Sequence, residues 1–258
     1  MSSRRRAGHP KRSRPRRTTT RASATTRSEC DSMGGYDSLL LDHDGVVVDV
    51  LDSAPVRQAA LDAFAAVGVD APEDDHVELV AFGPTYDELV SLSEHHGVDH
   101  ATLWRHRDDN LADTLREAAR DGGKQPYPDA GVLAGLEVPT GIVSNNQRRV
   151  VEFIAEQYEL TEQFAAIQAR EPHVDSLERK KPEPVFLESV MEDLGVSEPL
   201  YVGDRESDVV AGERAGVDTA FIRREHNADV SLGREPTYEV ESLEDVADIV
   251  RGTAAAED

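Results

Sequence analysis

Short apolar runs that end in polar or glycine residues recur along the chain and predict the strands of a buried sheet. Continuous apolar runs, rather than strict alternation, are typical of parallel strands that are covered on both faces. FAAIQA at 164–169 is a weaker candidate for a strand than the runs named next. The clearest runs are SLLLD at 38–42, TGIVSN at 140–145, PLYVGD at 199–204 and DTAFIR at 218–223.

Helical periodicity fills the intervals between these runs. Gly195 directly follows a helical pattern at 186–194 and is placed to end that helix, as glycine often does after the last turn. Strands that alternate with helices predict an α/β fold, a Rossmann-like parallel sheet with helices on both faces. Apolar residues recur four positions apart at Val150, Ile154 and Tyr158, and again at Phe186, Val190 and Leu194.

The segment at 53–127 has a different pattern. It reads as helices separated by glycines, with no strong strand. An all-helical block placed after the first strand predicts a small second domain over the sheet. We therefore expect a core domain formed by 33–52 and 128–258, with an inserted helical domain at 53–127.

Residues 1–32 form a basic arm with almost no apolar residues, and we expect this arm to be disordered. It carries ten Lys and Arg residues against Glu29 and Asp31, a net charge of +8. Clustered arginines can bind nucleic-acid phosphates. We favour the alternative that translation begins at Met33 and that the arm has no such role.

The remainder of the chain is strongly acidic, with a net charge of −31 inside a total of −23. The whole chain has four lysines against 24 arginines. An acidic surface poor in lysine indicates a protein kept soluble in concentrated salt, so we expect a cytoplasmic protein of a salt-accumulating organism. Cys30 has no partner for a disulfide, and no apolar run is long enough to span a membrane.

Polar side chains follow three of the predicted strands. In an open parallel sheet, ligands bind outside the carboxyl ends of the strands, so these side chains should converge on one crevice. Lys181, just ahead of a proline and a predicted helix, could join them. The strand-end residues are Asp42 and Asp44, then Ser144, Asn145 and Asn146, then Gly203, Asp204 and Asp208.

These segments resemble the motifs of the haloacid dehalogenase superfamily, in the branch with a helical cap between the first and second motifs (phosphoglycolate phosphatase and β-phosphoglucomutase-like proteins). YPDAGVLAGL at 127–136 resembles the family's return from cap to core, and the similarity spans about 36–249. The motifs, as they stand here, are DHDGV at 42–46, IVSNN at 142–146, KPEP at 181–184 and GDRESDVVAGERAG at 203–216.

The resemblance implies a Mg²⁺-dependent phosphatase that acts on a small organic phosphate monoester. Asp42 would be the nucleophile that forms an aspartyl-phosphate, and Asp44 the general acid and base. Asp42, the backbone carbonyl of Asp44, and Asp204 would hold Mg²⁺, with Asp208 behind them contacting Lys181 or a metal-bound water. The residues implied to bind phosphate are Gly45, whose turn would aim backbone amides at it, Ser144, Asn145 and Lys181.

Two other functions stay open at this point. A phosphomutase would transfer the phosphoryl group to a second hydroxyl of a sugar phosphate, and a nucleic-acid-associated protein would act through the basic arm. Dehalogenation is disfavoured, because dehalogenases of this superfamily lack the second aspartate, which is present here as Asp44.

Several residues have simpler interpretations. We expect His43 to point away from its two aspartate neighbours, Trp104 to pack in a core, and Arg205 to form a surface ion pair. His95, His96 and His100 suggest zinc, but no acidic ligand accompanies them in the sequence, so we expect a solvated surface there.

Overall fold

Six strands form one fully parallel sheet in the order β3-β2-β1-β4-β5-β6. The computed structural model describes residues 35–253, so the predictions made for the arm at 1–32 lie outside the described residues. The α/β fold and the five strands expected from the sequence are confirmed. The strands are β1 (Ser38–Leu41), β2 (Thr140–Gln147), β3 (Ala166–Arg170), β4 (Pro199–Gly203), β5 (Asp218–Ile222) and β6 (Tyr238–Val240).

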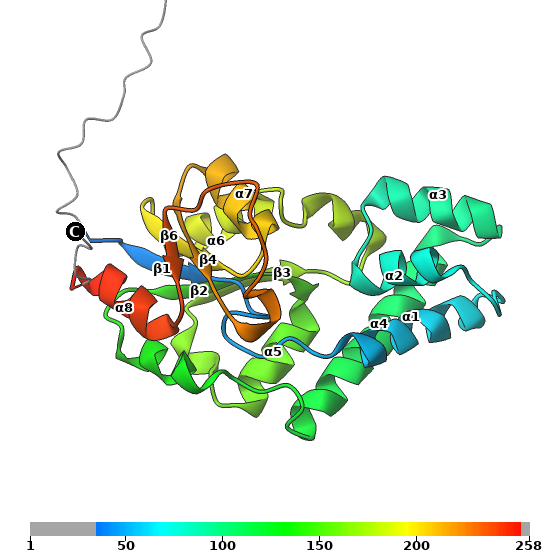
Figure 1. Cartoon of the computed structure of the whole chain (residues 1–258), viewed down its shortest axis with the longest axis horizontal. Helices are drawn as coiled ribbons and strands as arrows, with labels where there is room; N and C mark the ends of the chain where they lie inside the picture. The colour runs from blue at the N-terminus through cyan, green and yellow to red at the C-terminus, as the bar shows by residue number, and fades with distance from the viewer. Residues whose placement is uncertain (1–34, 254–258) are drawn as a thin grey trace, which may run out of the picture. The chain divides into compact units, whose positions relative to one another are not determined.

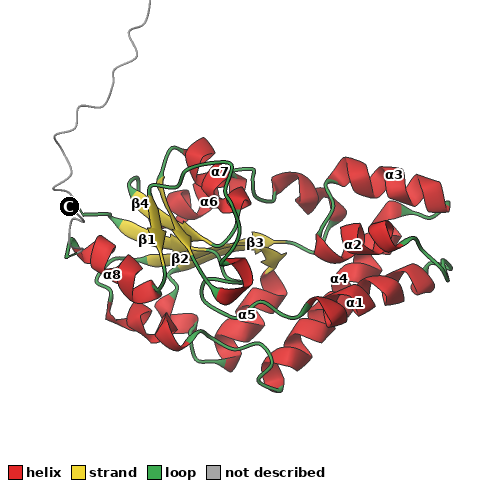
Figure 2. Ribbon diagram, in the orientation of Figure 1, coloured by secondary structure: helices red, strands yellow, loops and turns green. Residues whose placement is uncertain are grey.

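Helices cover both faces of the sheet, as Figures 1 and 2 show. One face carries α5 (Arg148–Gln157) and α8 (Leu243–Arg251), and the other carries α6 (Val185–Leu194) and α7 (Glu206–Ala215). Side chains of β1 explain this arrangement, because successive residues of a strand point to opposite faces. Leu39 and Leu41 pack in the cluster that includes α5 and α8, whereas Leu40 packs with residues of α6.

Four helices lie between β1 and β2, and we call them the helical insert: α1 (Ser53–Ala66), α2 (Asp74–Phe82), α3 (Tyr86–His96) and α4 (His100–Arg120). Short 3₁₀ segments connect other elements, at Pro128–Gly135, Thr161–Gln163, Val174–Arg179 and Glu225–Asn227. The insert has its own apolar cluster, in which Phe64 and Trp104 are the largest fully buried side chains. Trp104 is therefore a packing residue, as expected.

Helix α4 belongs to two hydrophobic clusters at once. Its first half contributes Leu103 and Trp104 to the cluster of the insert. Its second half contributes Leu111 and Leu115 to the cluster beneath the sheet, which is the one that includes α5 and α8. With 21 residues, α4 is about 32 Å long, which is long enough to reach both. The insert is thus attached to the sheet by a continuous helix.

Within residues 35–253, none of the helices combines the length and the apolar character needed to cross a membrane.

Candidate active site

The residues that follow β1 and β4 meet at the carboxyl edge of the sheet. The carboxylates of Asp42, Asp204 and Asp208 each offer an oxygen within 4.8 Å of the others, and all three side chains are buried. Lys181 joins them, with Nζ 2.9 Å from Asp42 Oδ1 and 2.7 Å from Asp208 Oδ1. The strand-end convergence expected from the sequence is present for these four residues.

Lys181 is held from several sides. Its ammonium group donates to the carbonyl oxygen of Val143 and to the hydroxyl of Tyr201, both at 3.0 Å. Asn145 fixes the backbone of Lys181: its Nδ2 donates to the Lys181 carbonyl (3.0 Å), and its Oδ1 accepts from the Lys181 amide (2.7 Å). Asn145, expected to bind phosphate, therefore directs its side chain to Lys181 instead. Lys180 is directed elsewhere, to the carbonyl oxygens of 83 and 84.

Asp42 lies in an electrostatic environment that opposes its ionisation. Burial raises the pKa of Asp42 to about 8, and the carboxylates of Asp208, Asp204 and Asp44 add to this effect, while Lys181 opposes it. A divalent cation among these oxygens would favour the ionised carboxylate. The site therefore has the charge distribution of a cation site.

Asp44 has its own cation, Lys124, which the sequence analysis did not single out. Lys124 is buried and forms an ion pair with Asp44 Oδ1, while Asn146 Nδ2 donates to Asp44 Oδ2 at 3.0 Å. Burial acts to raise the pKa of Asp44, but the charge of Lys124, with help from His43, holds that pKa well below its usual range. Asp44 is thus ionised in this arrangement.

His43 departs from expectation. It was expected to point away from both aspartates, but its ring Nδ1 lies 3.6 Å from Asp44 Oδ2, and the side chain is buried. Its backbone amide donates to Asp42 Oδ1 at 2.7 Å. The tight turn that starts at Asp42 brings the ring of His43 toward Asp44 and the amide of His43 toward Asp42.

Gly45 lets Asp204 approach the turn. Its φ is +84°, and a Cβ at this position would lie 2.2 Å from Asp204 Oδ2. The Gly45 amide donates to the carbonyl oxygen of Val48 at 2.8 Å and so closes the turn. That backbone amides of this turn face phosphate stays a prediction. The glycine serves the close approach of Asp204 to the first motif.

Asp204 has one oxygen engaged and one available. Oδ2 lies 2.7 Å from His226 Nε2, but nothing among the described residues forms a hydrogen bond with the buried Oδ1. Arg205 Nε lies 3.9 Å from that oxygen, on a side chain that is 59% exposed, so the ion pair expected for Arg205 is present but its carboxylate partner is buried. A buried carboxylate oxygen without a donor, beside other carboxylates, suits a hard cation such as Mg²⁺. His226 was not found from the sequence, because it lies far from any motif.

Ser144 lies at the same edge. The side chain is buried, and its Oγ accepts a hydrogen bond from the Asn146 amide at 3.1 Å. An accepting hydroxyl keeps its own proton for donation, which is the property that phosphate binding needs.

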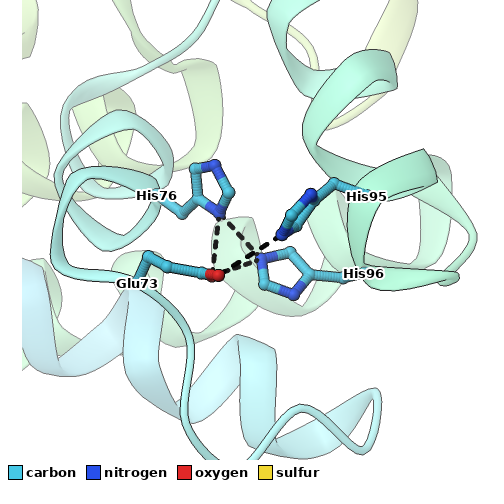
Figure 3. A group of neighbouring side chains, drawn as sticks. All are labelled: Glu73, His76, His95 and His96. Atoms are coloured by element: carbon cyan, nitrogen blue, oxygen red, sulfur yellow. Dashed lines mark hydrogen bonds and ion pairs between the residues drawn. The ribbon is translucent and has the colours of Figure 1, made fainter.

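The histidines of the insert also differ from expectation. Glu73 and His76 lie against His95 and His96, as Figure 3 shows, so the expectation that no acidic residue accompanies them is wrong. His100 is separate, with Nε2 3.4 Å from the Tyr86 hydroxyl. Glu73 is more than twenty residues before His95 in the chain, and only the packing of α2 with α3 brings them together.

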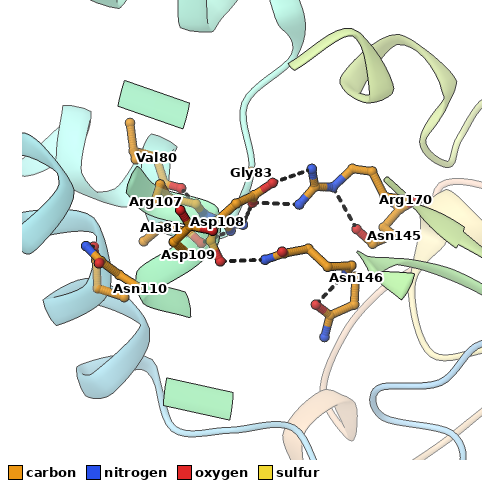
Figure 4. Close-up of polar contacts among 12 residues, drawn as sticks. Val80, Ala81, Gly83, Arg107, Asp108, Asp109, Asn110, Asn145, Asn146 and Arg170 are labelled. Atoms are coloured by element: carbon orange, nitrogen blue, oxygen red, sulfur yellow. Dashed lines mark hydrogen bonds and ion pairs between the residues drawn. The ribbon is translucent and has the colours of Figure 1, made fainter. Parts of the chain in front are cut away.

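A buried ion pair joins the insert to the sheet close to the site (Figure 4). Arg170, at the end of β3, contacts Asp108 of α4 through two nitrogens at 2.7 Å each. Arg107 contacts the same carboxylate at 3.1 Å, and it also donates to the carbonyls of residues 80 and 81. All three side chains are buried. We call this group the α4–β3 ion pair.

Comparison with known proteins gives a consistent set of relatives. Residues 39–222 match the family model of haloacid dehalogenase-like hydrolases. The chain is 25% identical to phosphoglycolate phosphatase 1 of Pseudomonas aeruginosa, over 81% of this chain and 77% of that protein. It is 29% identical to pyrophosphatase PpaX of Oceanobacillus iheyensis, over 48% of this chain and 58% of that protein.

Solved structures share the fold at lower sequence identity. The crystal structure of CbbY from Rhodobacter sphaeroides in complex with phosphate superimposes with a TM-score of 0.62, covering 81% of this chain and 95% of that chain at 16% identity. The sheet and its helices are thus a known arrangement.

Proposed function

Because the chain belongs to the haloacid dehalogenase-like hydrolase family, we propose that it is a Mg²⁺-dependent phosphatase that hydrolyses a small organic phosphate monoester through an aspartyl-phosphate. The observation that carries the proposal is the buried group of Asp42, Asp204 and Asp208 with Lys181 at the carboxyl edge of the sheet. The relative named phosphoglycolate phosphatase supports a phosphate ester as substrate, and the one named pyrophosphatase supports phosphoryl transfer more broadly.

Asp42 would be the nucleophile. A carboxylate oxygen of Asp42 attacks phosphorus, the bond from phosphorus to the ester oxygen breaks, and the phosphoryl group moves to Asp42. Lys181 and Ser144 would stabilise the phosphoryl oxygens, since an ammonium and a hydroxyl both donate to anionic oxygen. Water then attacks the aspartyl-phosphate and releases inorganic phosphate.

Asp44 would move the protons. Its carboxyl group gives a proton to the departing ester oxygen, and its carboxylate then takes a proton from the attacking water. Lys124 favours the ionised carboxylate, which is the form needed for the second step. We infer that the contact between Lys124 and Asp44 loosens when substrate binds, so that Asp44 can carry a proton for the first step.

Asp42, Asp204 and the backbone carbonyl of Asp44 would hold Mg²⁺, which suits this all-oxygen set. When bound, the cation would neutralise the carboxylates and the incoming phosphate. The helical insert would act as the cap that excludes water until the aspartyl-phosphate forms.

The test is phosphate release from p-nitrophenyl phosphate and from a panel of small phosphate monoesters, in molar KCl with and without Mg²⁺. We expect release that needs Mg²⁺ and that Asp42→Asn abolishes, at least 1,000-fold below the unchanged protein. Asp208→Asn is a useful companion, because it should lower activity through Lys181 without removing the nucleophile. No release by the folded, Mg²⁺-loaded protein would overturn the proposal, and a rearranged sugar phosphate in place of free phosphate would indicate a phosphomutase.

A further inference from the structure

A second cluster of metal-ligating groups lies in the helical insert, apart from the carboxylates of the candidate active site. It consists of Glu73, His76, His95 and His96, which we call the His–Glu cluster (Figure 3). Glu73 and His76 lie at the start of α2, and His95 and His96 form the end of α3. Each contributes one atom to a group in which all atoms lie within 4.8 Å of one another.

Three distances within the cluster are close to those of a four-coordinate metal. Zinc bound at 2.0–2.1 Å in a tetrahedron has ligand atoms about 3.3–3.4 Å apart. Oε2 of Glu73 lies 3.2 Å from His76 Nδ1 and 3.5 Å from His96 Nε2, and Oε1 of the same carboxylate lies 3.3 Å from His95 Nε2. His76 Nδ1 and His96 Nε2 are closer, at 2.9 Å, and a metal between them would require a separation a few tenths of an ångström larger.

The orientation of the rings supports the same conclusion. The three imidazoles pack edge to face in every pairing, with ring centroids 5.0–5.1 Å apart, and each presents a nitrogen to Glu73. Burial lowers the pKa of His96, and the neighbouring His76 and His95 add to this effect, while Glu73 opposes it. The neutral imidazole is the form that binds metal.

We propose that the His–Glu cluster binds a transition metal, with Zn²⁺ as the ion that fits best. Three imidazoles and one carboxylate form a donor set for zinc, whereas Mg²⁺ prefers the all-oxygen group at Asp42. The donor atoms of each site would thus determine which metal ion it binds. Four protein ligands would leave no position for substrate, so the metal would tie the first turn of α2 to the last turn of α3.

A zinc ion bound there would help to hold the α2–α3 pair of the insert in place. At the other end of these two helices, the connecting turn at Gly83 and Pro84 accepts hydrogen bonds from Lys180, at 2.7 and 2.6 Å. Zinc would fix one end of the α2–α3 pair, and Lys180 of the core contacts the other end.

The test is zinc binding to the full chain, stripped of metal and then saturated with Mg²⁺ so that the carboxylate group is filled. We expect one zinc per chain by calorimetry and a melting temperature that rises by about 5 °C or more at a hundredfold excess over the dissociation constant. Co²⁺ in the same site should give the intense visible absorption of tetrahedral coordination.

The double variant His95→Ala/His96→Ala should lose the zinc, the temperature shift and the cobalt spectrum. His100→Ala/His106→Ala is the matched control, since it removes two histidines of the same insert that lie outside the His–Glu cluster, and it should keep all three. Circular dichroism verifies that both variants fold. No zinc bound at micromolar concentrations, or zinc bound equally by the His95→Ala/His96→Ala variant, would overturn the proposal. Because these readouts do not use phosphatase activity, they stand or fall independently of the proposed function.

Discussion

A side chain at position 45 would occupy the space that the Asp204 carboxylate needs. We predict that Gly45→Ala lowers the free energy of unfolding by about 3 kcal/mol or more, because it adds a collision with Asp204 to the strain of a positive φ. Phosphatase activity should be lost with it. The measurement is urea unfolding in high salt, together with the phosphate-release assay.

Gly68→Ala is the matched control for this prediction. Gly68 has the same φ of +84°, but a Cβ there would meet no atom within 4 Å. Its cost should be the backbone strain alone, about 1–2 kcal/mol. If both variants lost the same free energy and both stayed active, the close approach of Asp204 to position 45 would have no importance.

The lysines show what residue-level reasoning could have found. In a chain that uses arginine almost everywhere, two of the three lysines outside the basic arm contact carboxylates of the candidate site, and the third contacts the helical insert. Lys181 contacts Asp42 and Asp208, Lys124 contacts Asp44, and Lys180 contacts the turn between α2 and α3. A compact ammonium on a flexible stem fits such positions where a planar guanidinium does not. The rarity of lysine could therefore have directed attention to Lys124, although not to its partner.

At the scale of elements, the α4–β3 ion pair holds the insert to the sheet. We predict that Arg170→Met lowers the free energy of unfolding by about 3 kcal/mol, because it leaves Asp108 buried with only Arg107 as a cation. Urea unfolding measures the effect.

The control is Arg148→Met. Arg148 forms an ion pair with Glu171, the residue after Arg170, but at the surface, with Nε 3.1 Å from the carboxylate. An exposed pair of this kind should cost less than about 1 kcal/mol. Equal effects of the two substitutions would mean that burial of the α4–β3 ion pair adds no stability.

The contact between Lys180 and the α2–α3 turn should depend on pH. Burial lowers the pKa of Lys180 to about 8, with Arg107 and Arg170 adding to the effect. Between pH 8 and the ordinary lysine pKa near 10.5, the unfolded chain therefore binds more protons at this residue than the folded chain. Stability contributed by Lys180 should rise with pH across that window.

We predict that the unfolding free energy of the unchanged protein, minus that of Lys180→Met, increases by about 2 kcal/mol between pH 7.5 and 9.5. The difference cancels the other groups that titrate in this range. Urea unfolding of both proteins at the two pH values gives the result, and a difference that stays constant would place the pKa of Lys180 near its ordinary value.

Elements were predictable where a run of residues carries its own pattern. The apolar runs identified five strands, and β1 and β4 show the reason most clearly, because a strand that is buried on both faces leaves few positions for polar residues. The edge strand β6 was missed, since its three residues include only one that is buried. The His–Glu cluster could not be predicted either: α2 and α3 must pack before Glu73 meets His95, and no local pattern encodes that meeting.

At the scale of the whole molecule, charge should govern stability. Residues 33–258 carry a net charge of −31, and screening by salt weakens the repulsion within such a surface. We predict that the melting temperature of the full chain rises by several degrees between 0.1 and 2 M KCl. Differential scanning calorimetry across that range measures it. A melting temperature that is highest in low salt would contradict the interpretation of the composition as an adaptation to salt.

The long helix α4 has a consequence for how this protein could exchange parts with its relatives. The insert is not a cassette bounded by two loops, because the second half of α4 fills the cluster beneath the sheet with Leu111 and Leu115. A graft that replaced all of 53–127 would remove part of the hydrophobic cluster that packs against the sheet, together with the cluster of the insert. Recombination that preserves the fold should instead cross over within α4, between Trp104 and Leu111, so that each half of the helix stays with the hydrophobic cluster in which it packs.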